Sequence, residues 1–403
     1  MSTIKAINNL REDTIFRSII DSPFFQRLKK IKQLGFVYLD WSDSLHTRYE
    51  HSIGSAEIAY RIALSVGLPQ IDSKKLSYAA ALHEVGMSPY SYSITEDICK
   101  SLDYNKMDMC SSLIAQNFSD ILGEHTDEII DIVLRKHGNE LYDQIIFGLV
   151  GANTLDYLTR DSLHTIPIFS NELLETILSR LTISNKALVL KAGYKDLYLM
   201  IHGAKKIMNH NIYFSPRRRT ADMMLSAAMR DSIDKGTASQ IANAFKNNAL
   251  FLNMDDDSFL EMMNFATQGT PHHDIVVMLS SGLIYESLDI THFVLTNFAQ
   301  YMEKPSLVRI IHEFIYDILQ IDGSRFIIDS PLNYIVRFHG EAYTGESSFN
   351  YSLPQELLSF TDLFAEPAIN RKRKNALRTQ SQWMIYYHPE VAETINKHFS
   401  DNE

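Results

Sequence analysis

Two histidines and an adjacent glutamate are the residues of this 403-residue chain whose types and spacing suit metal binding. His51 closes the segment HTRYEH, and His83 with Glu84 follows thirty-two residues later. Neutral imidazole nitrogens and carboxylate oxygens are ligands for divalent ions such as Mn, Fe, Ni or Zn. Because neighbouring positions of a helix face different ways, His83 and Glu84 reach one ion only where a helix ends. From the residue types alone, a metal site and histidines packed in an apolar core both stay open.

The elements that must position these residues are predominantly helices. Apolar residues recur at helical spacing through most of residues 14–265, as at Ile53, Ala56 and Tyr60. The chain has only 16 glycines and 11 prolines, which favours long, uninterrupted helices. After residue 265, turn signals and short strand-like runs become more frequent. We therefore expect a mostly α fold, with a helical domain over residues 1–268 and an α+β region of unknown role over residues 269–403.

Charge, cysteine count and hydropathy restrict the class of protein. The 38 basic and 49 acidic residues give a net charge of −11, which argues against a nucleic acid as partner. Two cysteines, Cys99 and Cys110, cannot form a disulfide scaffold in so long a chain, and they indicate a reducing compartment. The N-terminal residues lack the apolar segment of a signal peptide, and no run approaches the about 18 apolar residues of a membrane span. We expect a cytoplasmic protein that does not enter a membrane.

Three blocks follow one another in a fixed order: RYEHSIG at 48–54, ALHEVGMSPYSY at 81–92 and LDYLTRDS at 155–162. Together they resemble the motifs of HD-domain phosphohydrolases, in the branch of the deoxynucleoside triphosphate triphosphohydrolases, and the likeness extends over residues 15–265. The resemblance implies an HD-domain helical bundle that binds a nucleotide, a deoxynucleoside triphosphate, and forms a homo-oligomer. It also implies a divalent metal ion, Mn, Mg, Fe, Ni or Zn, and the following site residues: metal ligands at His51, His83, Glu84 and Asn153, a phosphate-binding guanidinium at Arg48, and sugar contacts from Tyr157 and Asp161.

Four positions depart from the motifs of that family. Glu84 and Asn153 stand where the family has aspartates, and Met87 and Tyr92 stand where it has histidines. Glu84 has a longer side chain and Asn153 a neutral amide, so the resemblance implies a weakened metal site. No histidine occurs between the His-Glu pair and His125. The imidazole that would protonate the leaving oxygen is therefore missing from the expected place.

Two functions stay open at this point. One is a nucleotide-binding pseudoenzyme with a degenerate active site, in which catalysis is weakened or lost. The other is an active metal-dependent phosphohydrolase of a nucleotide with altered metal or substrate preference, in which His125 or His137 supplies the proton. No catalytic residue is assigned. The three arginines at 217–219 are open between a phosphate site and a solvated face.

Overall fold

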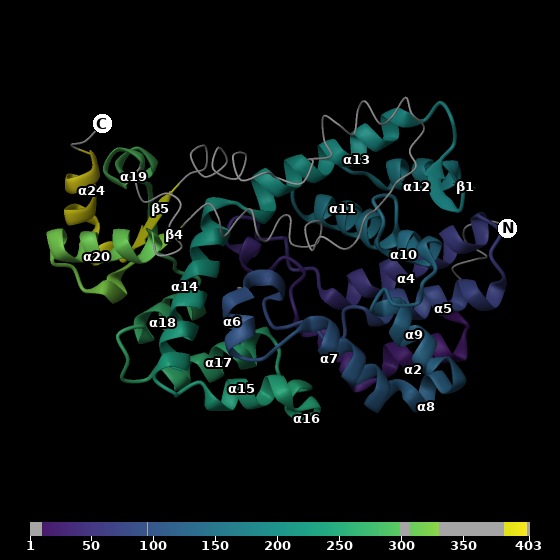
Figure 1. Cartoon of the computed structure of the whole chain (residues 1–403), viewed down its shortest axis with the longest axis horizontal. Helices are drawn as coiled ribbons and strands as arrows, with labels where there is room; N and C mark the ends of the chain where they lie inside the picture. The colour runs from purple at the N-terminus through teal and green to yellow at the C-terminus, as the bar shows by residue number, and fades with distance from the viewer. Residues whose placement is uncertain (1–9, 95, 299–306, 330–382, 401–403) are drawn as a thin grey trace. The chain divides into compact units, whose positions relative to one another are not determined.

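Helices form most of the part of the chain that the computed structural model describes, namely residues 10–94, 96–298, 307–329 and 383–400 (Figure 1). The predicted mostly α fold with an α+β elaboration in its C-terminal part is confirmed. The chain divides into two compact units. The first comprises the described residues up to Arg218 together with Ser232–Ala266, and the second comprises Arg219–Asp231 together with the described residues from Thr267 onward. The predicted domain boundary between residues 268 and 269 stays a prediction.

The first unit is built from helices joined by short turns. Its α-helices are α2 (Thr14–Asp21), α3 (Pro23–Arg27), α4 (Arg48–Ser65), α5 (Gln70–Leu82), α6 (Glu96–Ser101), α7 (Lys106–Leu113), α8 (Ser119–Leu122), α9 (Thr126–Val133), α10 (Glu140–Phe147), α11 (Ala152–His164), α12 (Asn171–Arg180), α13 (Lys195–Met208), α15 (Ser239–Lys246), α16 (Asn248–Phe251) and most of α17 (Asp256–Thr267). An antiparallel hairpin of β1 (Leu181–Ser184) and β2 (Ala187–Leu190) follows α12. Among the described residues, no helix is both long enough and apolar enough to cross a membrane.

Helix α4 begins at a capping box that fixes where two candidate site residues lie. The Glu50 carboxylate accepts a hydrogen bond from the Thr47 backbone N–H at 2.6 Å, and the Thr47 hydroxyl accepts one from the Glu50 N–H at 3.4 Å. These two bonds satisfy N–H groups that a helix start leaves without backbone partners. Arg48 is therefore the first residue of α4, and His51 follows it at a spacing that puts both on one side of the helix.

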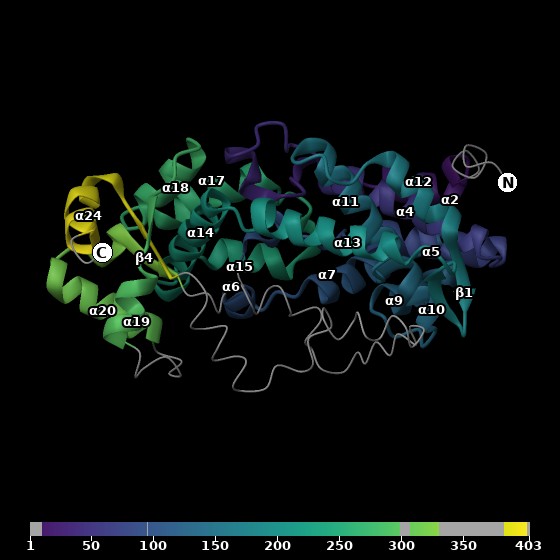
Figure 2. The same cartoon turned by 90° about the horizontal axis from the view of Figure 1, so that it is seen from above.

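Helices α4, α5, α10 and α11 pack against one another and position the candidate site, and α9 packs on α5 (Figures 1 and 2). Gly54 of α4 faces two side chains of α11. A Cβ atom at Gly54 would lie 1.8 Å from Asp156 Oδ1 and 2.4 Å from Arg160 Nη2. Any side chain there would have to displace the Asp156 and Arg160 side chains, so the glycine of the RYEHSIG block leaves room for their ion pair.

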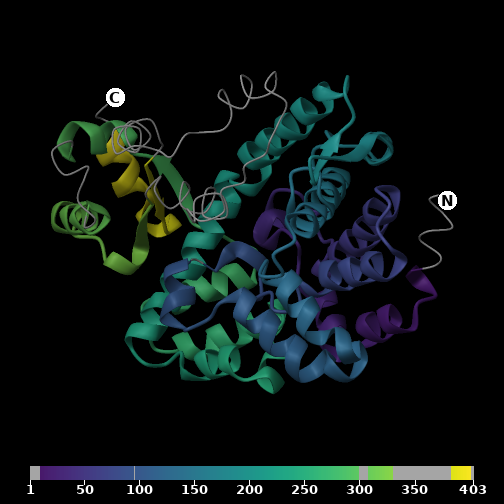
Figure 3. The same cartoon turned by 45° about the vertical axis from the view of Figure 1, so that its right-hand side comes forward.

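The second unit combines helices with a small antiparallel sheet. Its elements are the middle of α14 (Pro216–Asp234), α18 (His273–Ser280), β3 (Glu286–Asp289), α19 (Thr291–Phe298), α20 (Leu307–Leu319), β4 (Phe326–Asp329), β5 (Met384–Tyr387) and α24 (Ala392–Ser400). Strand β5 lies between β3 and β4, and its Tyr387 is paired with Glu286 on one side and Phe326 on the other. The yellow α24 lies beside the green helices of this unit in Figure 3. Buried apolar residues of α19, α20, β4, β5 and α24 form one core.

The three arginines at 217–219 are all paired with acceptors inside the protein: Arg217 with Asp40, Arg218 with the carbonyl of Tyr213, and Arg219 with Asp329 and Tyr386. The Arg219 and Asp329 side chains are 7% and 0% exposed. A buried guanidinium needs such a partner, since an unpaired buried charge is strongly unfavourable. Neither a solvated face nor a phosphate site describes Arg219, which instead pairs with buried residues of the second unit.

Candidate metal centre

His83 and Glu84 lie just beyond the end of α5, where both side chains reach the same point. The last helical residue is Leu82, and the His83 Nδ1 atom lies 2.6 Å from the Ala80 carbonyl oxygen. A carbonyl oxygen only accepts, so Nδ1 carries a proton and Nε2 of the neutral ring carries a lone pair. Burial lowers the pKa of His83, which favours this neutral form. The ring therefore presents Nε2 as a ligand atom.

Side-chain oxygens of two α11 residues lie beside the nitrogens of the His51 ring. Asp156 Oδ2 lies 2.7 Å from His51 Nδ1, and Asn153 Oδ1 lies 2.9 Å from His51 Nε2. Asp156 is in turn bound by Arg160 one helical turn later, at 2.8 Å. A carboxylate behind an imidazole fixes the orientation of the ring and makes its other nitrogen a better ligand.

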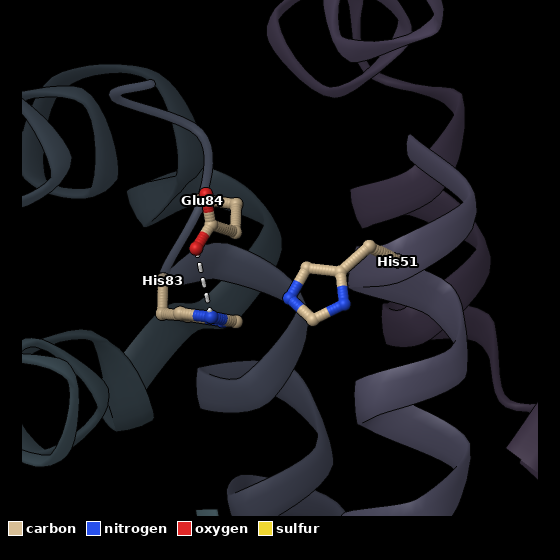
Figure 4. A group of neighbouring side chains, drawn as sticks. All are labelled: His51, His83 and Glu84. Carbon is tan, nitrogen blue, oxygen red and sulfur yellow. Dashed lines mark ion pairs between the residues drawn. The ribbon is translucent and has the colours of Figure 1, made fainter. Parts of the chain in front are cut away.

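The ligand atoms of His51, His83 and Glu84 all lie within 4.8 Å of one another, and the three residues are at most 3% exposed (Figure 4). His83 Nε2 has no hydrogen bond, although Glu84 Oε1 lies 3.1 Å away. Two ligands bonded to one ion at about 2.1 Å are separated by about 3.0–3.4 Å, so this separation fits a shared divalent ion. Asn153 Oδ1 lies beside His51 Nε2, and its role as a neutral fourth ligand stays a prediction. These residues therefore fit the metal that the sequence predicts, and which metal stays a prediction.

Two cations bind the Glu84 carboxylate from within the protein. Lys106 Nζ lies 2.8 Å from Glu84 Oε1, and Arg48 Nη1 lies 3.2 Å from Glu84 Oε2. Burial alone would raise the pKa of Glu84, but Lys106 and Arg48 outweigh it and hold that pKa well below its usual range. Lys106 is the first residue of α7, which Asn105 caps. The ring of Tyr92 lies 5.0 Å from the Arg48 guanidinium and 5.8 Å from Lys106 Nζ.

Arg48, the predicted phosphate-binding residue, is 3% exposed and bound to three acceptors of the protein. Besides Glu84, its guanidinium donates to Ser91 Oγ at 3.0 Å and to the Gln33 carbonyl oxygen at 3.1 Å. A phosphate that binds Arg48 must replace at least one of these acceptors. The structure thus brings Arg48 to the metal ligands through Glu84, and its phosphate contact stays a prediction.

The predicted sugar contacts lie further along α11. Asp161 is 1% exposed, and its two oxygens lie 2.7 Å from His46 Nε2 and 2.6 Å from the Tyr213 hydroxyl. Tyr157 is half-buried, and its ring meets that of Tyr213 edge-on at 6.3 Å. The Asp161 carboxylate therefore connects His46, which lies just before α4, with Tyr213 at the end of the π-helical turn Asn209–Tyr213. Contact of Tyr157 and Asp161 with a sugar stays a prediction.

The positions where the resembled family has histidines are occupied by two unlike residues. Met87 is 1% exposed and packs in the core, whereas Tyr92 is 47% exposed. His137 stacks on Tyr142 with ring centroids 5.0 Å apart. His125 ends a short 3-10 turn. Within the described residues, neither His125 nor His137 belongs to the group of candidate metal ligands, and a role of either imidazole as proton donor stays a prediction.

Sequence reasoning missed Lys106 and the role of Asp256. Asp256 is the first residue of α17, and its buried carboxylate accepts from the Tyr90 N–H at 2.6 Å and the Lys32 N–H at 3.0 Å. Tyr90 and the following Ser91 have φ values of 55° and 57°, in the left-handed region. Asp256 thus holds the turn in which Ser91 accepts a hydrogen bond from Arg48. A buried carboxylate with distant partners leaves no local pattern that could have been found.

Comparison with known proteins agrees with this geometry. The family model of the HD domain matches residues 48–162. An uncharacterized protein of Methanocaldococcus jannaschii is 34% identical over 223 residues, which are 54% of this chain and 46% of that protein. The deoxynucleoside triphosphate triphosphohydrolase SAMHD1 of Danio rerio is 30% identical over 138 residues, 32% of this chain and 21% of that protein.

Among solved structures, a hypothetical protein from Aquifex aeolicus superposes with a TM-score of 0.66 over 97% of this chain and 96% of that one, at 20% sequence identity, which shows a shared fold. The chain spans about half the length of the curated relatives it matches first. The matched segment contains Arg48, His51, His83, Glu84 and Asn153, so the family match and the cluster of ligands coincide. The chain therefore contains an HD domain and belongs to the HD-domain phosphohydrolase superfamily.

Proposed function

We propose that the protein binds a nucleotide, a deoxynucleoside triphosphate, beside the metal centre, and that its hydrolytic activity is weakened or lost. The observation that carries this proposal is that the candidate metal ligands and two cations meet at Glu84, while Met87, at a position where the resembled family has a histidine, is buried. The name of the Danio rerio relative supports the class of nucleotide.

The metal ion would be held by His51, His83 and Glu84, with Asn153 as a neutral donor. When bound, such an ion supplies Lewis acidity and a water that ionises near neutral pH. The chain's own residues orient the donors: Asp156 holds the His51 ring at 2.7 Å.

Charge at the centre favours an anion. Glu84 carries one negative charge, while Arg48 and Lys106 together carry two positive charges, so the three side chains sum to +1. The planar Arg48 guanidinium matches the oxygens of a phosphate, and the Lys106 ammonium adds a second positive point charge. We therefore propose that the triphosphate of the nucleotide faces Arg48.

The weakened chemistry follows from the missing proton donor. The leaving oxygen of a phosphate ester must be protonated, and the Met87 thioether has no proton to give. General acid–base assistance contributes about 10²- to 10⁴-fold to a rate, so its loss leaves slow turnover at best. Neutral Asn153 in place of a carboxylate also lowers the affinity for a divalent ion.

An active phosphohydrolase with altered metal or substrate preference is the second candidate. It is favoured by the His83 Nε2 lone pair, which is buried without a hydrogen bond beside Glu84. Incubating the purified protein with each deoxynucleoside triphosphate and with Mn, Mg, Fe, Ni or Zn separates the two candidates. Product release at about 1 s⁻¹ or faster, a typical enzyme rate, would reject lost catalysis.

Nucleotide binding is tested by calorimetry on Arg48→Ala. Loss of a charge-assisted hydrogen bond should weaken binding by about 1.5–3 kcal/mol, roughly tenfold or more. Arg61→Ala is the matched control, because Arg61 lies on the same helix and pairs with Glu175 at 2.6 Å. Equal affinity of Arg48→Ala and the parent for every nucleotide that binds would reject this placement.

We further propose that the protein forms a homo-oligomer and that it works in the cytoplasm. The second part is in line with Cys99 and Cys110, which form no disulfide. Light scattering checks the first part: a species at the chain mass of 46.2 kDa, with and without nucleotide, would contradict it.

A further inference from the structure

The strongest unexplained contact at the metal centre is that of Lys106. Its ammonium binds Glu84 Oε1 at 2.8 Å, and that same oxygen lies 3.1 Å from His83 Nε2. The oxygen that would bind a metal ion is therefore the one that Lys106 occupies. Arg48 binds the other oxygen, Oε2, at 3.2 Å.

We propose that Lys106 is an internal cation that competes with the divalent metal ion for Glu84 and so sets the metal affinity of the centre. With Lys106 on Oε1, the negative charge of Glu84 is compensated by the protein itself. An ion that binds between His83 and Glu84 must displace the ammonium or share the oxygen with a like charge 2.8 Å away. This inference rests on the proposed metal site.

Lys106 is better placed to leave Glu84 than Arg48 is. Arg48 is also held by Ser91 and Gln33, and its side chain is 4% exposed. The Lys106 side chain is 19% exposed, it starts helix α7, and the half-exposed Tyr92 ring lies next to it. A flexible four-carbon side chain at such a position can turn its ammonium into solvent. Lys106 is therefore a positioning residue that acts on the metal through Glu84.

The test is titration of the purified full chain with Mn²⁺ by calorimetry, without any nucleotide. Lys106→Met removes the ammonium and keeps a side chain of similar length. Its affinity for Mn²⁺ should rise about tenfold or more, because the ion no longer competes with a charge-assisted hydrogen bond or meets a like charge. Lys106→Arg keeps the charge and should bind Mn²⁺ as the parent does.

The matched control is Lys74→Met. Lys74 also pairs with a carboxylate of the first unit, that of Asp13, at 2.6 Å, and Asp13 is not one of the metal ligands. Its Mn²⁺ affinity should equal that of the parent. Damage to the fold lowers metal affinity, so a higher Mn²⁺ affinity of Lys106→Met cannot come from misfolding. Circular dichroism checks that the variant is folded, and tighter binding should also give a larger Mn²⁺-induced rise in its melting temperature.

Two results overturn the proposal. One is a Lys106→Met protein that is folded by circular dichroism and binds Mn²⁺ no more tightly than the parent. The other is a lack of Mn²⁺ binding by both proteins, which removes the metal site itself. Because no nucleotide is present, either result leaves the nucleotide-binding proposal to its own test with Arg48→Ala.

Discussion

Replacing Glu84 with glutamine removes the one negative charge that Lys106 and Arg48 share. The substitution keeps the size of the side chain, but it replaces one of the two carboxylate oxygens that accept from Lys106 at 2.8 Å and Arg48 at 3.2 Å with an NH2 group, which only donates. Each such hydrogen bond is worth about 1.5–3 kcal/mol, and breaking a buried ion pair by removing one partner destabilises by about 3–5 kcal/mol. We therefore expect Glu84→Gln to lower the free energy of unfolding of the first unit by about 3–5 kcal/mol.

The assay is urea unfolding followed by tryptophan fluorescence. The chain has two tryptophans, Trp41 in the first unit and Trp383 in the second. In a Trp383→Phe background, Trp41 alone reports on the first unit, and its transition can be analysed separately.

The control for this experiment is Glu57→Gln. Glu57 lies on α4 and pairs with Arg11 at 2.7 Å, but the Arg11 side chain is 63% exposed. An exposed ion pair contributes about 0–1 kcal/mol, so Glu57→Gln should change stability by no more than that. If Glu84→Gln is destabilised as little as Glu57→Gln, the reasoning that Glu84 binds two buried cations is wrong.

Three further predictions concern Asp13, Cys110 and Asn153. Burial opposes the charge of Asp13, but Lys74 and hydrogen bonds lower its pKa. The parent should therefore be more stable than Asp13→Asn above about pH 4, and this difference should vanish as the pH falls through the folded pKa of Asp13. Thermal melts from pH 7 to 2 measure the difference, and a difference that stays constant would contradict the prediction. Burial raises the pKa of Cys110 to about 11. Iodoacetamide should therefore label half-buried Cys99 first and Cys110 only in urea. Equal labelling rates of the two cysteines, measured by mass spectrometry, would show that Cys110 is not protected by burial. Asn153→Asp should raise Mn²⁺ affinity about 10- to 100-fold in calorimetry, and an unchanged affinity would exclude position 153 as a ligand.

The features of the fold that could be predicted are those that depend on residues close together in the sequence. Helical spacing of apolar residues predicts α4 and α11, and the Thr47–Glu50 capping box fixes the start of α4. The end of α5 at Leu82 agrees with the requirement that His83 and Glu84 leave the helix to reach one point. By contrast, the assignment of residues 219–231 to the second unit depends on contacts with residues after 267, which no local pattern encodes.

The candidate site could be predicted only in part, for the same reason. The spacing of His51, His83 and Glu84 raises the metal hypothesis because their chemistry is specific. Lys106 has no such mark: a lysine after a capping asparagine is common on protein surfaces, and only the folded chain shows it on Glu84. Asp161 is similar, since its pairing with His46 spans 115 residues.

Because the sequence of one unit interrupts that of the other within helix α14, neither unit corresponds to one continuous stretch of the chain. The middle of α14, Arg219–Asp231, belongs to the second unit, while the first unit resumes at Ser232. No single stop or start codon can therefore yield either unit complete. A fragment ending at residue 266 would carry the Arg219 guanidinium without the Asp329 carboxylate, and buried Met224 without Tyr285, whose backbone N–H contacts its sulfur at 3.2 Å. Recombination that exchanges the C-terminal part between relatives would likewise have to exchange thirteen residues in the middle of a helix.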